Sequence, residues 1–140
     1  MNINNNDLEP ISIAYDKLGK IKGLPVWKDV LINKIRSKKA LKNLLESFEE
    51  DRKQVLEDLA DKDENGKAII AENKYVFSED NEAKATAAVG ELVASISKKD
   101  TDVDLITIKA ELFEKISKDA ELADLLEPLV LAGLVTINED

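Results

Sequence analysis

The feature that most restricts the fold of this sequence is one long segment without glycine or proline. After Pro25 neither residue occurs again until Gly66. Apolar side chains recur along it at helical spacing: Trp27, Leu31, Ile35, Leu41, Leu45, Phe48, Val55 and Leu59. We therefore predict one helix over 25–60, about 50 Å long at 1.5 Å per residue. We expect so long a helix to form one arm of a helical hairpin or to dock on a neighbouring subunit.

Charged side chains along this segment leave a second interpretation open. Lys34, Lys38 and Arg52 fall on or next to the apolar stripe, which disfavours a regular coiled coil. The alternative to a continuous helix is a break near Arg36–Lys39, where four consecutive residues are polar.

Shorter elements are expected on both sides of the long helix. Asp7 is a suitable first residue for a helix over 7–19, because its carboxylate accepts from the free N–H groups of a first turn. Asn65-Gly66 is a strong turn dipeptide. The β-prone residues that follow it predict a β-hairpin over 67–78.

Three further elements complete the prediction. Residues 80–97 are rich in small apolar side chains at helical spacing, residues 103–108 alternate and are β-branched, and residues 118–132 carry a leucine stripe. We expect a helix, a strand that joins the hairpin, and a last helix that Pro128 kinks or breaks. The sequence has no repeats and no low-complexity linker, which predicts a single domain over 1–140. The fold class is α+β and mainly helical: a long helical hairpin, a small antiparallel β-hairpin or sheet, and a C-terminal helix.

The composition excludes most catalytic and metal chemistry. The 140 residues include no cysteine and no histidine. Disulfides, thiol chemistry, the usual zinc and haem ligands, and Ser–His or Cys–His catalysis are therefore ruled out. The five glycines are scattered, so no phosphate-binding loop is present in the sequence. We predict a non-enzymatic protein with no catalytic residues and no cofactor. The longest apolar run, Leu129–Val135, is too short to span a membrane, which predicts a soluble protein.

The net charge of −9 conceals a strong polarity along the chain. Residues 17–43 contain nine bases and one acid, a net charge of +8. Residues 1–16 carry −3, and residues 44–140, with 11 bases and 25 acids, carry −14. This segregation suits a chain whose basic segment meets an acidic surface.

Three lysines define the candidate partner-binding face. Lys34, Lys38 and Lys42 are spaced i, i+4 and i+8, so a helix places them in one row. We predict that they bind a protein partner and that Trp27 anchors a helix pair. The alternative is a solvated face that pairs with the acidic part of the same chain. Nucleic acid is disfavoured because the chain as a whole is acidic.

One stretch matches the calcium-loop pattern D-x-[DN]-x-[DN]-G-x5-E. Alternate positions of such a loop supply ligands, the glycine makes the sharp turn, and the last glutamate closes the shell. The residue two positions after the glycine is Ala68 in place of a bulky apolar residue, and the residues after the loop favour a strand over a helix. An acidic helix end followed by an Asn-Gly turn explains the same residues. The candidate ligands are Asp61, Asp63, Asn65 and Glu72.

Three stretches together carry a family resemblance. Leu24-Pro25 opens a helix that contains SFEEDRKQVLEDLADKDENGK (Ser47–Lys67), and IIAENKYVFSED (Ile69–Asp80) and DAELADLLEPLV (Asp119–Val130) follow. Their order and spacing, over residues 24–130, resemble a family of small proteins of unknown function encoded by tailed bacteriophages and prophages near morphogenesis genes. The resemblance implies a virion component or an assembly factor, and it implies no site residues.

The function predicted from the sequence is that of a phage virion structural or assembly protein, acting through helix-mediated protein–protein contacts. Its partners would be other phage structural proteins or further copies of itself, in the host cytoplasm during assembly or in the virion. One alternative is a small acidic phage-encoded regulator or inhibitor that binds a host protein. Another is a calcium-dependent binding module. We expect neither nucleic acid nor a membrane as partner.

Overall fold

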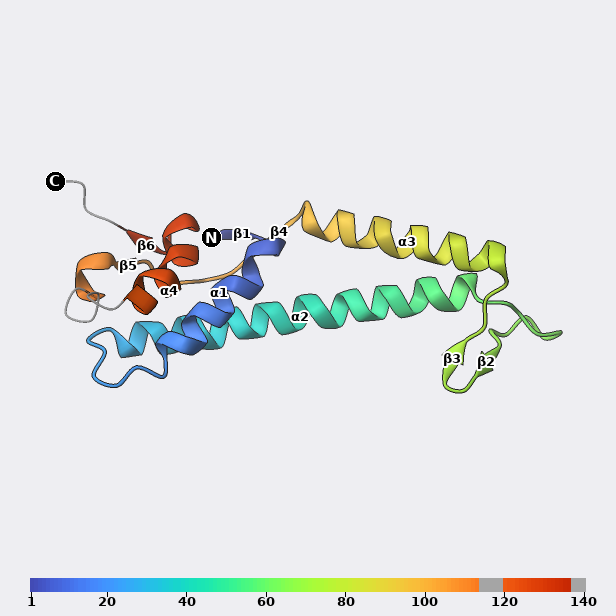
Figure 1. Ribbon diagram of the computed structural model, residues 1–140, viewed down its shortest axis with the longest axis horizontal. Helices are drawn as coiled ribbons and strands as arrows, with labels where there is room; N and C mark the ends of the chain where they lie inside the picture. The colour runs from blue at the N-terminus through green and yellow to red at the C-terminus, as the bar shows by residue number, and fades with distance from the viewer. Residues whose placement is uncertain (114–119, 137–140) are drawn as a thin grey trace. The chain divides into compact units, whose positions relative to one another are not determined.

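A computed structural model describes residues 1–113 and 120–136 of the chain (Figure 1). The chain divides into two compact units, the first made of residues 1–43 with residues from 99 onward, and the second of residues 44–98. The boundary falls inside helix α2 (Trp27–Leu59), which therefore contributes residues to both units. The fold class predicted from the sequence is confirmed, because helices dominate and the strands are short.

Helix α2 is continuous, so the predicted long helix is confirmed and there is no break at Arg36–Lys39. Strong helix formers without glycine or proline allow the backbone ladder to run through these polar residues. In the first unit one face of α2 is buried through Val30, Asn33 and Ser37, which are spaced i, i+3 and i+7.

Helix α1 (Asn5–Leu18) of the first unit begins two residues before Asp7, where the sequence predicts its start. The side chain of Asn4 caps it, accepting from the backbone N–H of Asn6 at 2.9 Å. Helix α1 packs against helix α4 (Ala120–Leu131). The predicted start of this last helix, at residue 118, lies outside the described residues.

Two short strand pairs close the first unit. Strand β1 (Asn2–Asn4) pairs antiparallel with β4 (Asp100–Asp102), and β5 (Ile108–Lys109) pairs parallel with β6 (Val135–Thr136). A short 3₁₀ helix, η1 (Ala110–Phe113), follows β5. Apolar side chains from the helices, from β5 and β6 and from η1 form most of the core, and those buried most completely are Leu8, Ile11, Tyr15, Leu18, Val30, Ile108, Phe113, Leu129, Leu134 and Val135.

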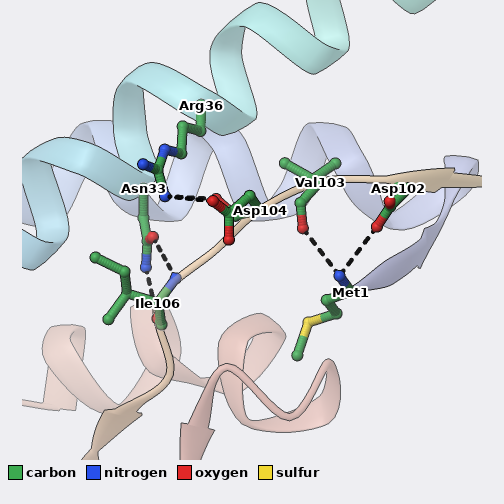
Figure 2. A network of polar contacts seen from close by, with 7 residues as sticks. All are labelled: Met1, Asn33, Arg36, Asp102, Val103, Asp104 and Ile106. Atoms are coloured by element: carbon green, nitrogen blue, oxygen red, sulfur yellow. Dashed lines mark hydrogen bonds and ion pairs between the residues drawn. The ribbon is translucent and has the colours of Figure 1, made fainter.

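The buried amide of Asn33 holds the chain between β4 and β5 in place (Figure 2). Its Nδ2 donates to the carbonyl oxygen of Ile106 at 2.8 Å, and its Oδ1 accepts from the backbone N–H of Ile106, also at 2.8 Å. The same Nδ2 donates to the hydroxyl of Tyr15 at 3.0 Å. One turn further along α2, Arg36 donates to the carbonyl oxygen of Asp104 at 3.1 Å. Asn33 and Arg36 of α2 therefore make hydrogen bonds to the backbone of this segment that a neighbouring strand usually makes.

The prediction of a strand over 103–108 is wrong, because side chains of α2 and no neighbouring strand bond the backbone there. Residues 103–107 form no strand, and the chain pairs only on either side of them, at β4 and β5. Neither strand joins the hairpin, since β4 pairs with β1 and β5 with β6. The alternating side chains Val103 and Leu105 are buried as the pattern indicates, and so is Ile108, but Asn33 satisfies the backbone of Ile106.

The second unit contains the C-terminal half of α2, a β-hairpin and helix α3 (Glu79–Ser97). Strands β2 (Ile70–Ala71) and β3 (Lys74–Tyr75) pair antiparallel, so the hairpin predicted over 67–78 is confirmed in a shorter form. Its two turn residues, Glu72 and Asn73, have φ values of 53° and 64°, as a type I′ turn requires.

Asp61 connects the end of α2 to the start of α3. Its Oδ1 accepts from the backbone N–H of Ser78 at 3.0 Å and from Nδ2 of Asn81 at 2.8 Å. The Ser78 N–H first, and then the Asn81 amide, hold the pKa of the Asp61 carboxyl below its usual range. Ser78 makes no side-chain cap of its own, so the Asp61 carboxylate supplies the acceptor at the N-terminus of α3.

Replacing Asn33 tests how strongly the first unit depends on this amide. In Asn33→Leu the backbone N–H and C=O of Ile106 lose their partners, and we expect the free energy of unfolding to fall by about 2 to 4 kcal/mol. Urea unfolding followed by the fluorescence of Trp27, the chain's one tryptophan, reports on this unit. The matched control is Asn43→Leu at an exposed position of the same helix, which we expect to change the free energy by less than about 0.5 kcal/mol. Equal effects of the two substitutions would contradict this account.

The buried phenol of Tyr15 makes the stability of the first unit depend on alkaline pH. Burial raises the pKa of Tyr15 from 10.0 to about 12, against a smaller lowering by the hydrogen bond with Asn33. Because the unfolded chain loses this proton at lower pH than the folded chain, stability falls as pH rises from 10 to 12, by roughly 3 kcal/mol for a shift of this size. We expect Tyr15→Phe to show a shallower loss over the same pH range in urea unfolding. An unchanged slope would show that Tyr15 does not titrate in this way.

Candidate protein interface

An exposed apolar row lies on the N-terminal half of α2. Trp27, Leu31 and Ile35 are spaced i, i+4 and i+8, and they are 56%, 43% and 58% exposed. Their helix buries its other side through Val30, Asn33 and Ser37, so the row projects away from the core of the first unit. Apolar side chains exposed in a contiguous row, with polar residues at their margin, are typical of a protein interaction site.

The predicted basic row runs beside the apolar one. Lys34 and Lys38 are i+3 neighbours of Leu31 and Ile35, which makes the two rows adjacent on the surface of α2. Lys38 and Lys42 are exposed, and Lys34 is half-buried. The structure thus places Trp27 and the three predicted lysines on one broad face of α2, which we call the α2 face: Trp27, Leu31, Lys34, Ile35, Lys38 and Lys42.

A basic groove of about 300 Å³ between α1 and α2 borders the α2 face. Lys17, Lys20, Lys34 and Lys38 line it, together with the carboxylate of Asp16. Lys20 and Lys34 each contact Asp16 at 3.5 Å, and Lys20 first, then Lys34, hold the pKa of Asp16 below its usual range. One carboxylate among four ammonium groups leaves the groove positively charged at neutral pH.

The apolar part of the α2 face contains a hollow of about 110 Å³. Trp27, Leu31 and Lys34 form its α2 side, and Gly19, Ile21 and Leu24 from the α1–α2 connection lie opposite. A Cβ on Gly19 would lie 3.5 Å from Cδ of Lys34, so a residue with a side chain there would narrow the space. The Lys28 ammonium lies 5.6 Å from the centroid of the Trp27 ring, which adds a further cation at the edge.

Two of the candidate calcium ligands, Asp61 and Asp63, accept hydrogen bonds from backbone N–H groups of the second unit. Oδ1 of Asp63 accepts from the N–H of Asn65 at 2.9 Å and from that of Lys67 at 3.0 Å, which closes a turn at Gly66. Asp61 is bonded to the start of α3, and Glu72 is an exposed residue of the β2–β3 turn. Within residues 1–113 and 120–136 no three carboxylates gather as a group that could hold a metal ion.

Two features of the first unit carry no clear signal in the sequence. Asn33 reads as one more polar residue of a helix, and only the fold shows that it is buried against Ile106. The second feature is a hollow between α1 and α4, which brings together residues about 120 positions apart, such as Asp7 and Glu127. For Asn33, the one available signal is its helical spacing from the apolar residue Val30, which predicts that both lie on the same face of α2.

Comparison of the chain with family models, with curated proteins and with solved structures finds no match. Of the helices in the described residues, none combines the length and the apolar character that crossing a membrane requires.

The hydrogen bonds of Asp61 and Asp63 lead to an expectation for calcium. Because both carboxylates already accept from backbone N–H groups, binding an ion would cost those contacts. We expect titration of the chain with Ca²⁺ at millimolar concentration to give no binding heat in calorimetry and no change in the melting temperature. A saturable heat that Glu72→Gln abolishes would restore the calcium-binding hypothesis.

Proposed function

We propose that the chain is a non-enzymatic assembly protein that works by protein–protein contact, and that the α2 face is its contact surface. The observation that carries the proposal is the juxtaposition on one helix of an exposed Trp27–Leu31–Ile35 row and the Lys34–Lys38–Lys42 row. A few anchors that become buried in the contact, tryptophan prominent among them, supply most of the affinity of such interfaces. Charges at the margin select the partner and speed association.

The chemistry of the α2 face indicates the chemistry of its partner. A partner has to supply an apolar side chain that fits the hollow beside Trp27 and carboxylates that meet the lysines. An amphipathic acidic helix provides both at i, i+3, i+4 and i+7 positions. The distribution of charge along this chain, basic over 17–43 and acidic elsewhere, supports recognition of an acidic protein surface.

The setting that we propose is the assembly of a tailed-bacteriophage particle. The support for this setting is the resemblance of residues 24–130 to small phage and prophage proteins, which a long exposed helix in the same segment suits. The partners are then phage structural proteins or other copies of the chain, in the host cytoplasm during assembly or in the virion.

Leu31→Asp tests the α2 face directly. The substitution puts a carboxylate into the hollow that is to meet an acidic partner, and we expect roughly a tenfold loss of the chain from purified phage particles or assembly intermediates, quantified by mass spectrometry. The control is Ile70→Ser, which removes an exposed apolar side chain from β2, 61% exposed against 43% for Leu31, and leaves the α2 face intact. Circular dichroism confirms that both variants fold.

The outcome separates assembly from its alternatives. Retention of Leu31→Asp at the level of the unsubstituted chain would contradict the α2 face as the contact surface. Absence of the unsubstituted chain from particles and intermediates, together with stoichiometric co-purification of a host enzyme, would replace assembly by regulation of that enzyme.

A further inference from the structure

The first unit carries a second surface whose chemistry is the converse of the α2 face. The hollow between α1 and α4 has a volume of about 360 Å³. Its apolar lining comes from Pro10 and Ile11 of α1 and from Pro128 and Leu131 of α4, and its charged groups are all carboxylates. We call this surface the acidic mouth, with the acids Asp7, Asp124 and Glu127.

Leu131 is the most exposed large apolar residue of the described chain, at 81%. It lies at the C-terminal end of α4, four residues after Glu127 and seven after Asp124, so the three side chains share one helix face. The proposed partner of the α2 face has to supply an apolar side chain and carboxylates, and this face of α4 has both.

We propose that the partner of the α2 face is the acidic mouth of a second copy of this chain, with Leu131 seated in the hollow beside Trp27 and Leu31. The inference rests on the proposed function of the α2 face and names its occupant. Charge complementarity supports it, because the mouth presents three carboxylates and the α2 face three lysines.

The spacing of the two rows fixes the direction of the contact. From Leu131 back to Asp124 is seven residues, and from Leu31 forward to Lys38 is also seven, about 10 Å in each helix at 1.5 Å per residue. With α4 of one copy antiparallel to α2 of the next, Leu131 faces Leu31 and Asp124 faces Lys38. In the same register Glu127 lies opposite Ile35, one residue along the helix from Lys34. Parallel helices would place the carboxylates away from the lysines.

The α2 face and the acidic mouth are different surfaces of the same chain. Each copy can therefore offer one of them to the copy before it and the other to the copy after it. The contact is made twice in a two-fold dimer, or once per copy in a ring or an open filament. Two or three turns of each helix bury less area than a permanent interface does, so the association is weak and weakens further as salt rises.

Reversal of one charge pair tests the contact. Sedimentation at about 0.2 mM chain and low salt measures association of the unsubstituted protein and of Lys38→Glu, Asp124→Lys and the double variant, all at residues with exposed side chains. We expect each single substitution to raise the dissociation constant about tenfold, because like charges then face each other. In the double variant the introduced carboxylate at position 38 of one copy meets the introduced ammonium at position 124 of the next. The dissociation constant then returns to within about threefold of the original.

The controls are matched reversals away from both surfaces. Lys53→Glu, Glu50→Lys and their double variant change exposed residues of the second unit by the same charges. We expect none of the three to change the dissociation constant by more than about twofold, since charges on an exposed surface outside the contact are screened by salt.

Each result supports or overturns the proposal. A double variant that associates no better than the single variants overturns the Lys38–Asp124 contact, and so does an unsubstituted chain that stays monomeric at the same concentration. Self-association that Lys38→Glu abolishes and Asp124→Lys leaves intact overturns the acidic mouth as occupant but retains the α2 face. The proposed function is tested separately, by whether Leu31→Asp lowers the association of the chain with particles.

Discussion

The first unit depends on one buried polar contact, the amide of Asn33 against the backbone of Ile106. Burying an amide is costly unless its donors and acceptors are paired, and Asn33 pairs with the N–H and C=O of Ile106 and with the hydroxyl of Tyr15. These bonds join helix α2, helix α1 and the chain between β4 and β5. Apolar burial alone permits small sliding between such parts, whereas three directed hydrogen bonds select one register.

The same contact determines which side of α2 remains for binding. With Val30, Asn33 and Ser37 turned to the core, Trp27, Leu31 and Ile35 lie on a different and exposed part of the helix surface. Lys34 and Lys38 lie between the two sides and border the groove toward α1. The α2 face is thus a consequence of how the first unit packs, which is why we base the proposed function on it. On the same unit, α1 and α4 leave Leu131 exposed among carboxylates, which gives the α2 face a chemically matched surface.

Periodicity predicts the helices of this chain well, because the backbone hydrogen bonds of a helix lie within the segment itself. The long helix, the β-hairpin and the last helix are found at their predicted places, and the Lys34–Lys38–Lys42 row follows from helical spacing alone. The strand over 103–108 was predicted from alternation, but alternation reports which side chains are buried and says nothing of what bonds the backbone. A distant side chain, Asn33, satisfies Ile106, and β1 and β6 pair with the flanking residues. The acidic mouth was missed for the same reason, since α1 and α4 meet only in the folded chain.

Hydrogen exchange at the backbone amide of Ile106 tests the central claim most directly. This N–H lies in a stretch without secondary structure, and its acceptor is the Oδ1 of Asn33 at 2.8 Å. The account predicts that the Ile106 amide exchanges as slowly as the amides of α2 around Val30, because both are released only when the first unit opens. Exchange at the rate of an exposed loop would contradict the claim that Asn33 holds this segment in place.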